Sequence, residues 1–243
     1  MPSSFFEQKL FALCRLWGYN VKWSDMMIAK DVKIIEYSKP VEFFNTLTHS
    51  VAAVMSVVGL VMIVMKAEGF RETFASAVYG LSLIAVYTVS SIYHGLKKSE
   101  AKRIARLIDH MTVPILIAGT ATPCTLIGLY RINIPVSILI FVLAWLCTGF
   151  GIISKFFFFE KLSKITPIVY ILASLVMMGC AVPLLGQMKT KAYLGLGDGN
   201  IFYLIGAFFC LLGVKKPACH AIFHFLVAFA SFIHFYVIYM YIF

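Results

Sequence analysis

The chain has 243 residues, of which 61% are hydrophobic and only 13% are charged, and its formal net charge is +10. Soluble domains are about 45–50% apolar and about 25% charged, so this composition excludes an ordinary soluble protein and indicates an integral membrane protein. The six cysteines are scattered without a C-x-x-C pair, which disfavours a disulfide framework or a thiolate metal site.

Residues 1–39 precede the first long apolar run and are mixed in charge. In the stretch FFEQKLFALCRLW, the helical spacing of Phe6, Leu10, Leu13 and Trp17 predicts an amphipathic helix that lies at the membrane surface. We therefore divide the chain into a cytoplasmic N-terminal segment and a membrane domain over residues 40–243.

Seven later segments are apolar over about 20 residues, the length that crosses a bilayer. Charged residues, glycine or proline separate them, in linkers that are too short to hold another domain. The predicted spans are 43–65, 73–96, 107–130, 133–154, 165–186, 196–214 and 218–242. We expect an all-α integral membrane protein with a seven-transmembrane-helix bundle.

The orientation follows from the 21 lysines and arginines, most of which fall in residues 1–39 and in the linkers 97–106, 155–164 and 215–216. The positive-inside rule then predicts a cytoplasmic N-terminus and a C-terminus outside, and we expect a location in the plasma membrane. The basic linkers lack interleaved aromatic residues, so their charge suits anionic lipid and we expect no nucleic-acid partner.

Polar residues gather at the predicted cytoplasmic ends of four of these segments. They are Glu42, Asn45 and His49 in the first segment, Ser90 and His94 in the second, Asp109 in the third, and His220 and His224 in the seventh. Ionisable residues inside a membrane are energetically costly and mark a functional site by default. These residues are therefore expected to form one site in the cytoplasmic leaflet.

The histidine spacing favours a metal. His220 and His224 are four residues apart, which places both rings on one helix face roughly 6 Å apart. Together with His94 they would give three imidazoles and a free fourth position, as in catalytic zinc sites. Magnesium and calcium prefer oxygen ligands and fit poorly, and haem fits poorly because two histidines on one face cannot flank one macrocycle, although haem on His94 with a single partner stays open.

The alternative interpretation is that these histidines only form hydrogen bonds between packed helices. His234 provides a contrast, because it lies ten residues beyond His224 and thus about 15 Å deeper along the same helix. We expect His234 to pack away from the site.

Three motifs in order, EFFNTLTHS, SSIYHGLKKSEAKRIARLIDHMTVPILIAGTATP and CHAIFHF, resemble the hemolysin III branch of the progestin and adipoQ receptor family, over roughly residues 40–243. The resemblance implies a seven-helix bundle with the N-terminus inside and a zinc ion held by His94, His220 and His224. It also implies that Asp109 reaches the metal through a water and that Ser90 lies beside it.

The resemblance leaves several activities open, since family members are described as receptors, as hemolysins and as ceramide-type amidases. We expect a zinc-dependent hydrolase of an amide or ester lipid, with membrane lipid as substrate, Asp109 as base and Ser90 as a hydrogen-bond donor. The alternatives are a ligand-sensing receptor with a structural zinc and a pore-forming cytolysin. The sequence names no protein partner.

Overall fold

The computed structural model describes residues 32–162, 165–166, 169–170, 172, 175, 190–213 and 215–243. Every regular element within these residues is helical, and six helices there are long and apolar enough to cross a membrane. The helices are α2 (Lys39–Lys66), α3 (Gly69–Gly95), α4 (Glu100–Pro123), α5 (Ile134–Leu162), α7 (Thr190–Gly213) and α8 (Pro217–Val237). Two π-helical turns, η2 (Cys124–Leu129) and η4 (Ile238–Ile242), continue α4 and α8.

The prediction of an all-α membrane protein is confirmed for the described part of the chain. The predicted fifth span, 165–186, lies largely outside the described residues, and the predicted surface helix around Phe6 to Trp17 lies wholly outside them. Seven helices and the orientation across the membrane therefore remain predictions.

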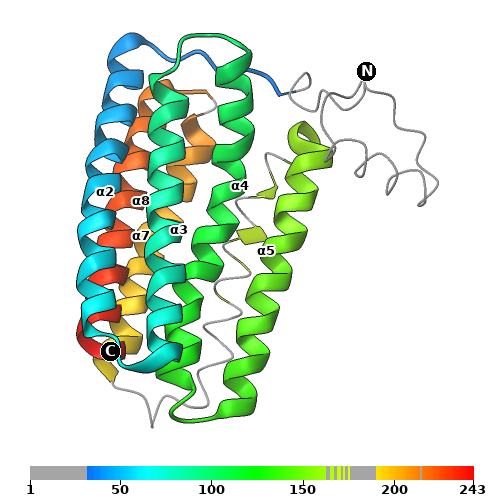
Figure 1. The fold of residues 1–243 in the computed structure, drawn as a ribbon. Helices are drawn as coiled ribbons and strands as arrows, with labels where there is room; N and C mark the ends of the chain where they lie inside the picture. The colour runs from blue at the N-terminus through cyan, green and yellow to red at the C-terminus, as the bar shows by residue number, and fades with distance from the viewer. Residues whose placement is uncertain are drawn as a thin grey trace, which may run out of the picture.

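The helices run roughly parallel to one long axis, with α2, α4 and α8 in one direction and α3, α5 and α7 in the other (Figure 1). Helix α2 packs against both α3 and α8, α3 packs against α4, and α7 packs against α8. As a result, α2 begins, α3 ends and α8 begins at one end of the bundle, which we call the site end.

The largest differences from the predicted spans lie at the start of α4 and at the end of α5. Helix α4 begins at Glu100 and not at 107, because the Ser99 side chain accepts a hydrogen bond from the backbone N–H of Lys102 and caps the helix. Helix α5 continues through the charged stretch KFFFFEKL to Leu162, where the predicted span ends at 154. In both helices the charged residues occupy helical turns. Because α4 begins at Glu100, Asp109 lies inside this helix and not at its start.

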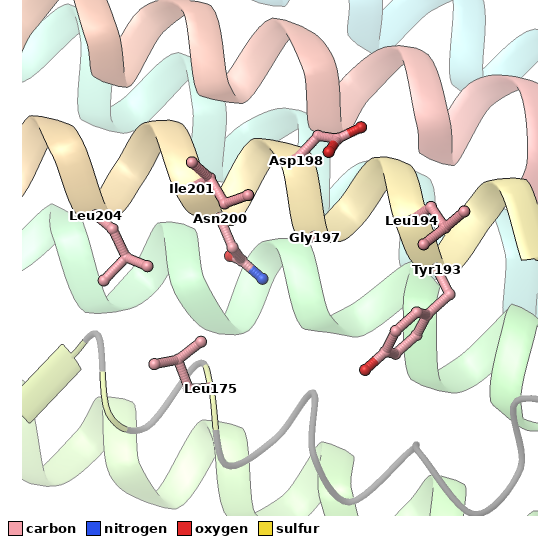
Figure 2. A pocket seen from close by; sticks show the side chains of 8 residues that line it. All are labelled: Leu175, Tyr193, Leu194, Gly197, Asp198, Asn200, Ile201 and Leu204. Atoms are coloured by element: carbon pink, nitrogen blue, oxygen red, sulfur yellow. The ribbon is translucent and has the colours of Figure 1, made fainter.

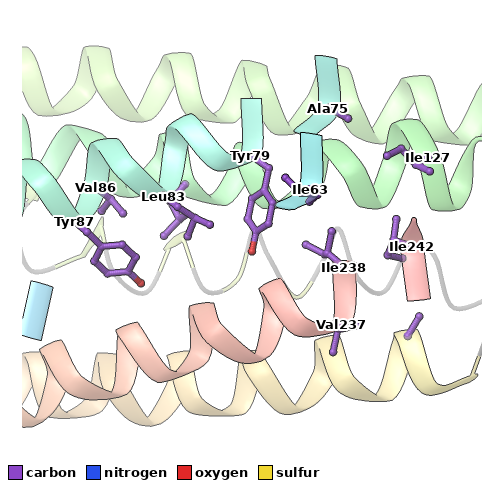
Figure 3. Close-up of a cluster of buried hydrophobic side chains, with 12 residues drawn as sticks. Ile63, Ala75, Tyr79, Leu83, Val86, Tyr87, Ile127, Val237, Ile238 and Ile242 are labelled. Atoms are coloured by element: carbon purple, nitrogen blue, oxygen red, sulfur yellow. The ribbon is translucent and has the colours of Figure 1, made fainter. Parts of the chain in front are cut away.

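An apolar cluster fills the bundle away from the site end (Figure 3). Ile63 of α2, Tyr79 of α3, Ile127 of η2 and Ile238 of η4 are each fully buried in it. Large apolar side chains on the outer face of α2, such as Phe43 and Met65, are exposed, as expected for a helix that faces lipid tails.

Close packing of α2 on α3 depends on Gly80. A Cβ atom at this position would lie 2.8 Å from Leu60 Cβ and 3.1 Å from Leu60 Cα, which leaves no room for a side chain. Glycine thus permits the two backbones to approach, as small residues do in membrane bundles.

Gly80→Val should therefore destabilise the protein by about 1–3 kcal/mol, the usual effect of overpacking a filled core, and should lower the melting temperature in detergent. Gly149→Val on α5 is the matched control, because a Cβ atom there meets nothing within 4 Å. Equal melting temperatures for the two variants would contradict this packing.

Candidate metal centre

Three histidine side chains meet at the site end. His94 lies in the last turn of α3, and His220 and His224 lie in the first turns of α8. One ring nitrogen from each lies within 4.8 Å of those from the other two, and the Nε2 atoms of His220 and His224 are 3.0 Å apart. The structure therefore brings together the three residues that the sequence predicted as metal ligands, and we call them the histidine triad.

Local sequence explains the placement of the triad. Pro217 stands in the first turn of α8, where its missing N–H removes no helical hydrogen bond, so the helix begins directly before His220. Four-residue spacing then puts His220 and His224 on one face. On α3, the helix ends at Gly95, which leaves His94 buried in its last turn with 2% of its surface exposed.

The hydrogen bonds of the triad fit a metal ion. His94 Nδ1 lies 2.6 Å from Glu42 Oε2, while its Nε2 is buried and has no hydrogen-bond partner among the described residues. An unsatisfied buried polar atom costs about 1–3 kcal/mol, which a metal–nitrogen bond would remove. Three imidazoles suit zinc, copper, iron or nickel better than magnesium or calcium.

The predicted supporting residues on α2 all contact the triad. Glu42 and Asn45 both reach His94 Nδ1, at 2.6 and 3.3 Å. His49 lies against His224, with ring nitrogens 3.0 and 3.1 Å from His224 Nδ1. None of the three belongs to the set of described ligand atoms that converge within 4.8 Å.

Asp109 and Ser90 form a second polar pair beside the triad. Ser90 lies one turn before His94 on α3 and is 3% exposed. The Asp109 carboxylate of α4 lies within electrostatic range of Ser90, His94 and Arg106. Asp109 stands outside the converging ligand set found among the described residues, so it is a neighbour of the triad and not a member of it.

His234 behaves as expected for a packing residue. Its Nε2 donates a hydrogen bond to the Leu196 carbonyl oxygen of α7 at 3.0 Å, and its ring packs where Gly199 has no side chain. His234 is not part of the triad, so the prediction that it packs away from the site is confirmed.

Two further contributors were not predicted from the sequence. Lys102 Nζ donates to Glu42 Oε1 at 2.7 Å, and the Tyr37 ring stacks on the His220 ring with centroids 4.7 Å apart. The basic linker containing Lys102 was interpreted as an orientation signal that suits anionic lipid, and no motif marks Tyr37. Contacts of this kind depend on tertiary packing, which spacing along one helix does not reveal.

Tyr37 belongs to an extended stretch, residues 32–38, that crosses the site end before α2 begins. Arg106 donates a hydrogen bond to the Lys33 carbonyl oxygen, and Lys98 donates one to Glu36. The hydrogen bond from Lys98 holds the pKa of the Glu36 carboxyl below its usual value. The stretch therefore covers part of the triad from the direction of the helix ends.

A separate hollow of about 330 Å³ lies along α7 (Figure 2). Tyr193, Asp198 and Asn200 line it from α7, and Leu175 lines it from the opposite side. No triad residue lines this hollow, so it is distinct from the candidate metal centre.

The fold and the triad define a multi-pass helical membrane protein with a buried histidine cluster that could hold a metal ion. The model of the Haemolysin-III related family matches residues 37–235, and the chain belongs to this family, the hemolysin III branch of the progestin and adipoQ receptor family.

Several curated proteins are similar to the chain. Hemolysin-3 of Bacillus cereus is 28% identical over 219 residues, which cover 89% of this chain and 98% of the relative. A Hemolysin-3 homolog of Bacillus subtilis (strain 168) is 28% identical over 75% of this chain and 85% of its own length. The human Monocyte to macrophage differentiation factor is 25% identical, with 82% and 83% covered.

If the triad holds the metal, substitution of any one of its histidines should remove the metal from the protein. Changing His94, His220 or His224 to Ala should reduce bound metal from about one ion per chain towards zero, because the site loses one of its three protein ligands. Mass spectrometry of the purified proteins measures the metal content. His234→Ala should retain the metal, and full retention in His220→Ala would contradict the assignment.

Proposed function

We propose that this protein is a zinc-dependent hydrolase of membrane lipids that carry an amide bond of the ceramide type or an ester bond. The observation that supports this proposal is a buried histidine triad with a carboxylate and a hydroxyl, Asp109 and Ser90, directly beside it but outside the ligand set. A purely structural metal has no need of an adjacent acid–base group.

His94, His220 and His224 would hold the zinc and leave a fourth position for substrate or water. A bound zinc ion supplies Lewis-acid chemistry, since it polarises a carbonyl group and makes water more acidic. Asp109 would accept the proton of the attacking water and return it to the departing amine or alcohol. Ser90 would orient the Asp109 carboxylate by donating a hydrogen bond to it.

A lipid is the favoured substrate because the triad lies within helices long and apolar enough to cross a membrane. Around the site, Ile92 of α3, Ile104 of α4 and Ile222 of α8 expose their side chains, as lipid-facing residues do. On the side of the site that faces the helix ends, the Tyr37 ring stacks on the His220 ring. We therefore expect the substrate to enter from the lipid-facing side of the bundle.

A second candidate is a ligand-sensing receptor with a structural metal. It is supported by the origin of the triad in α3 and α8, two helices far apart in sequence that a metal would cross-link. The name of the bacterial relatives also suggests a pore-forming cytolysin, but among the described residues the bundle interior around Ile63, Ile127 and Ile238 is a buried apolar cluster, which disfavours a pore there.

Asp109→Asn separates catalysis from a structural metal. The variant keeps the side-chain shape but loses the base, so zinc and melting temperature should stay near wild type while turnover falls by roughly 10²–10⁴-fold. Release of fatty acid from ceramides and phospholipids, with and without chelator, measures turnover. Asp198→Asn on α7 is the matched control and should remain active.

Wild-type protein that carries full zinc but releases no product from a broad lipid panel would remove the hydrolase proposal and favour the receptor. The same outcome follows if Asp109→Asn retains both zinc and full turnover, because the proposed base would then have no role.

The proposal also places the site in the cytoplasmic leaflet of a seven-helix bundle in the plasma membrane, with the N-terminus inside, on the basis of the charge distribution. In a background without native cysteines, Lys98→Cys should react only with reagents that reach the cytoplasm. Ala67→Cys, in the connection at the other end of α2 and α3, should react with impermeant external reagents. The reverse labelling pattern would contradict a site in the cytoplasmic leaflet and put it in the outer leaflet.

A further inference from the structure

Helix α2 contributes no member of the triad, yet it touches two of the three histidines. It packs against both α3 and α8, the helices that carry the triad. Glu42, Asn45 and His49, at positions i, i+3 and i+7, share the face of α2 that points at the site. The contacts of this face determine which nitrogen of each ring is available.

Glu42 determines the ring nitrogen that His94 offers. A carboxylate only accepts hydrogen bonds, so at 2.6 Å His94 Nδ1 must be the donor, and the proton-free Nε2 then faces the triad. Lys102 Nζ donates to the other oxygen of Glu42 at 2.7 Å and to the Leu96 carbonyl oxygen at 2.9 Å. Asn45 approaches the same Nδ1 at 3.3 Å. The hydrogen bond to Glu42 is shorter and charge-assisted, so it determines which nitrogen of His94 carries the proton.

His49 plays the corresponding role for His224. Its Nε2 lies 3.3 Å from the His224 carbonyl oxygen, which can only accept, so His49 Nε2 carries the proton. His224 Nδ1 lies 3.1 Å from His49 Nδ1, which can accept a hydrogen bond, and 3.0 Å from the protonated His49 Nε2. With the His224 proton on Nδ1, donated to His49 Nδ1, its Nε2 is proton-free at 3.0 Å from His220 Nε2. His49 is itself held edge-on against the Tyr87 ring, with centroids 5.0 Å apart.

We infer that α2 is the positioning helix of the metal centre: Glu42 and His49 orient His94 and His224 so that their Nε2 atoms converge, and these two residues set the affinity for the metal. The inference rests on the metal binding in the proposed function and adds the residues that tune it. Hydrogen-bond partners of metal-ligating histidines typically change metal affinity by about 10–100-fold.

Glu42→Leu and His49→Phe remove the two contacts while retaining apolar bulk. Each should weaken zinc binding by about 10–100-fold in competition with a chromogenic chelator, yet still reach one zinc per chain at saturating metal. The visible absorption of the Co²⁺-loaded protein should also change, because the ligand rings are no longer fixed. Glu42→Gln and His49→Asn restore an acceptor and should recover part of the affinity.

Matched controls come from outside the site. Glu72→Leu removes a carboxylate that pairs with Arg131 at 2.8 Å near the other end of α3, and His234→Phe removes a buried histidine of α8. Both should bind zinc as the wild type does. Circular dichroism selects the folded variants, and either member of the Glu42 and His49 pair is sufficient for the test if the other does not fold.

Each outcome has a distinct meaning. Unchanged zinc affinity and an unchanged Co²⁺ spectrum in the folded variants would overturn the inference while leaving zinc binding intact. Complete loss of zinc in folded His49→Phe, even at saturating metal, would make His49 a ligand and overturn its positioning role. A wild type that binds no zinc would instead contradict the proposed function itself.

Discussion

The constraint on which the site end depends is the convergence of three imidazole rings, two of them buried and that of His220 half-buried, among helices apolar enough to cross a membrane. The Nε2 atoms of His220 and His224 face each other at 3.0 Å, and the Nε2 of His94 has no hydrogen-bond partner among the described residues. Water cannot relieve this arrangement at low energetic cost in a bilayer, whereas one cation would satisfy all three nitrogens. A metal ion would therefore explain why α3 and α8, two helices far apart in the sequence, bring their imidazoles to one point.

The bundle divides into two regions with different tasks. Near the site end, Glu42 lies between His94 and Lys102 and forms a hydrogen bond or ion pair with each. Farther along α8, Tyr87 and Tyr203 each make a 2.5 Å hydrogen bond to Ser231, and beyond them the apolar cluster fills the interior. The close-packed region fixes the helix axes, so the rings at the site end have a rigid support. Rigid support suits both catalysis and metal binding, because both need fixed geometry.

The triad could be predicted from the sequence because its placement depends on local features. The spacing of His220 and His224 puts them on one helix face, and the alternating direction of the predicted spans puts His94 at the same end of the bundle. The sequence could not predict the stacking of Tyr37 on His220 or the ion pair of Lys102 with Glu42, because these contacts join segments whose relative position only packing determines. Hydropathy also misplaced the start of α4, since a Ser99 cap can begin a helix in a charged stretch. The seven-span count extends into residues outside the described ranges.

X-ray absorption at the zinc edge of the purified wild-type protein tests the central claim most directly, because it reports the ligands around the metal in solution. Three imidazoles from α3 and α8 predict three nitrogen neighbours at about 2.0–2.1 Å, with the multiple scattering of imidazole rings and one further light atom at the open position. Sulfur neighbours at about 2.3 Å, or a shell of oxygen atoms without imidazole scattering, would contradict a metal centre built on His94, His220 and His224.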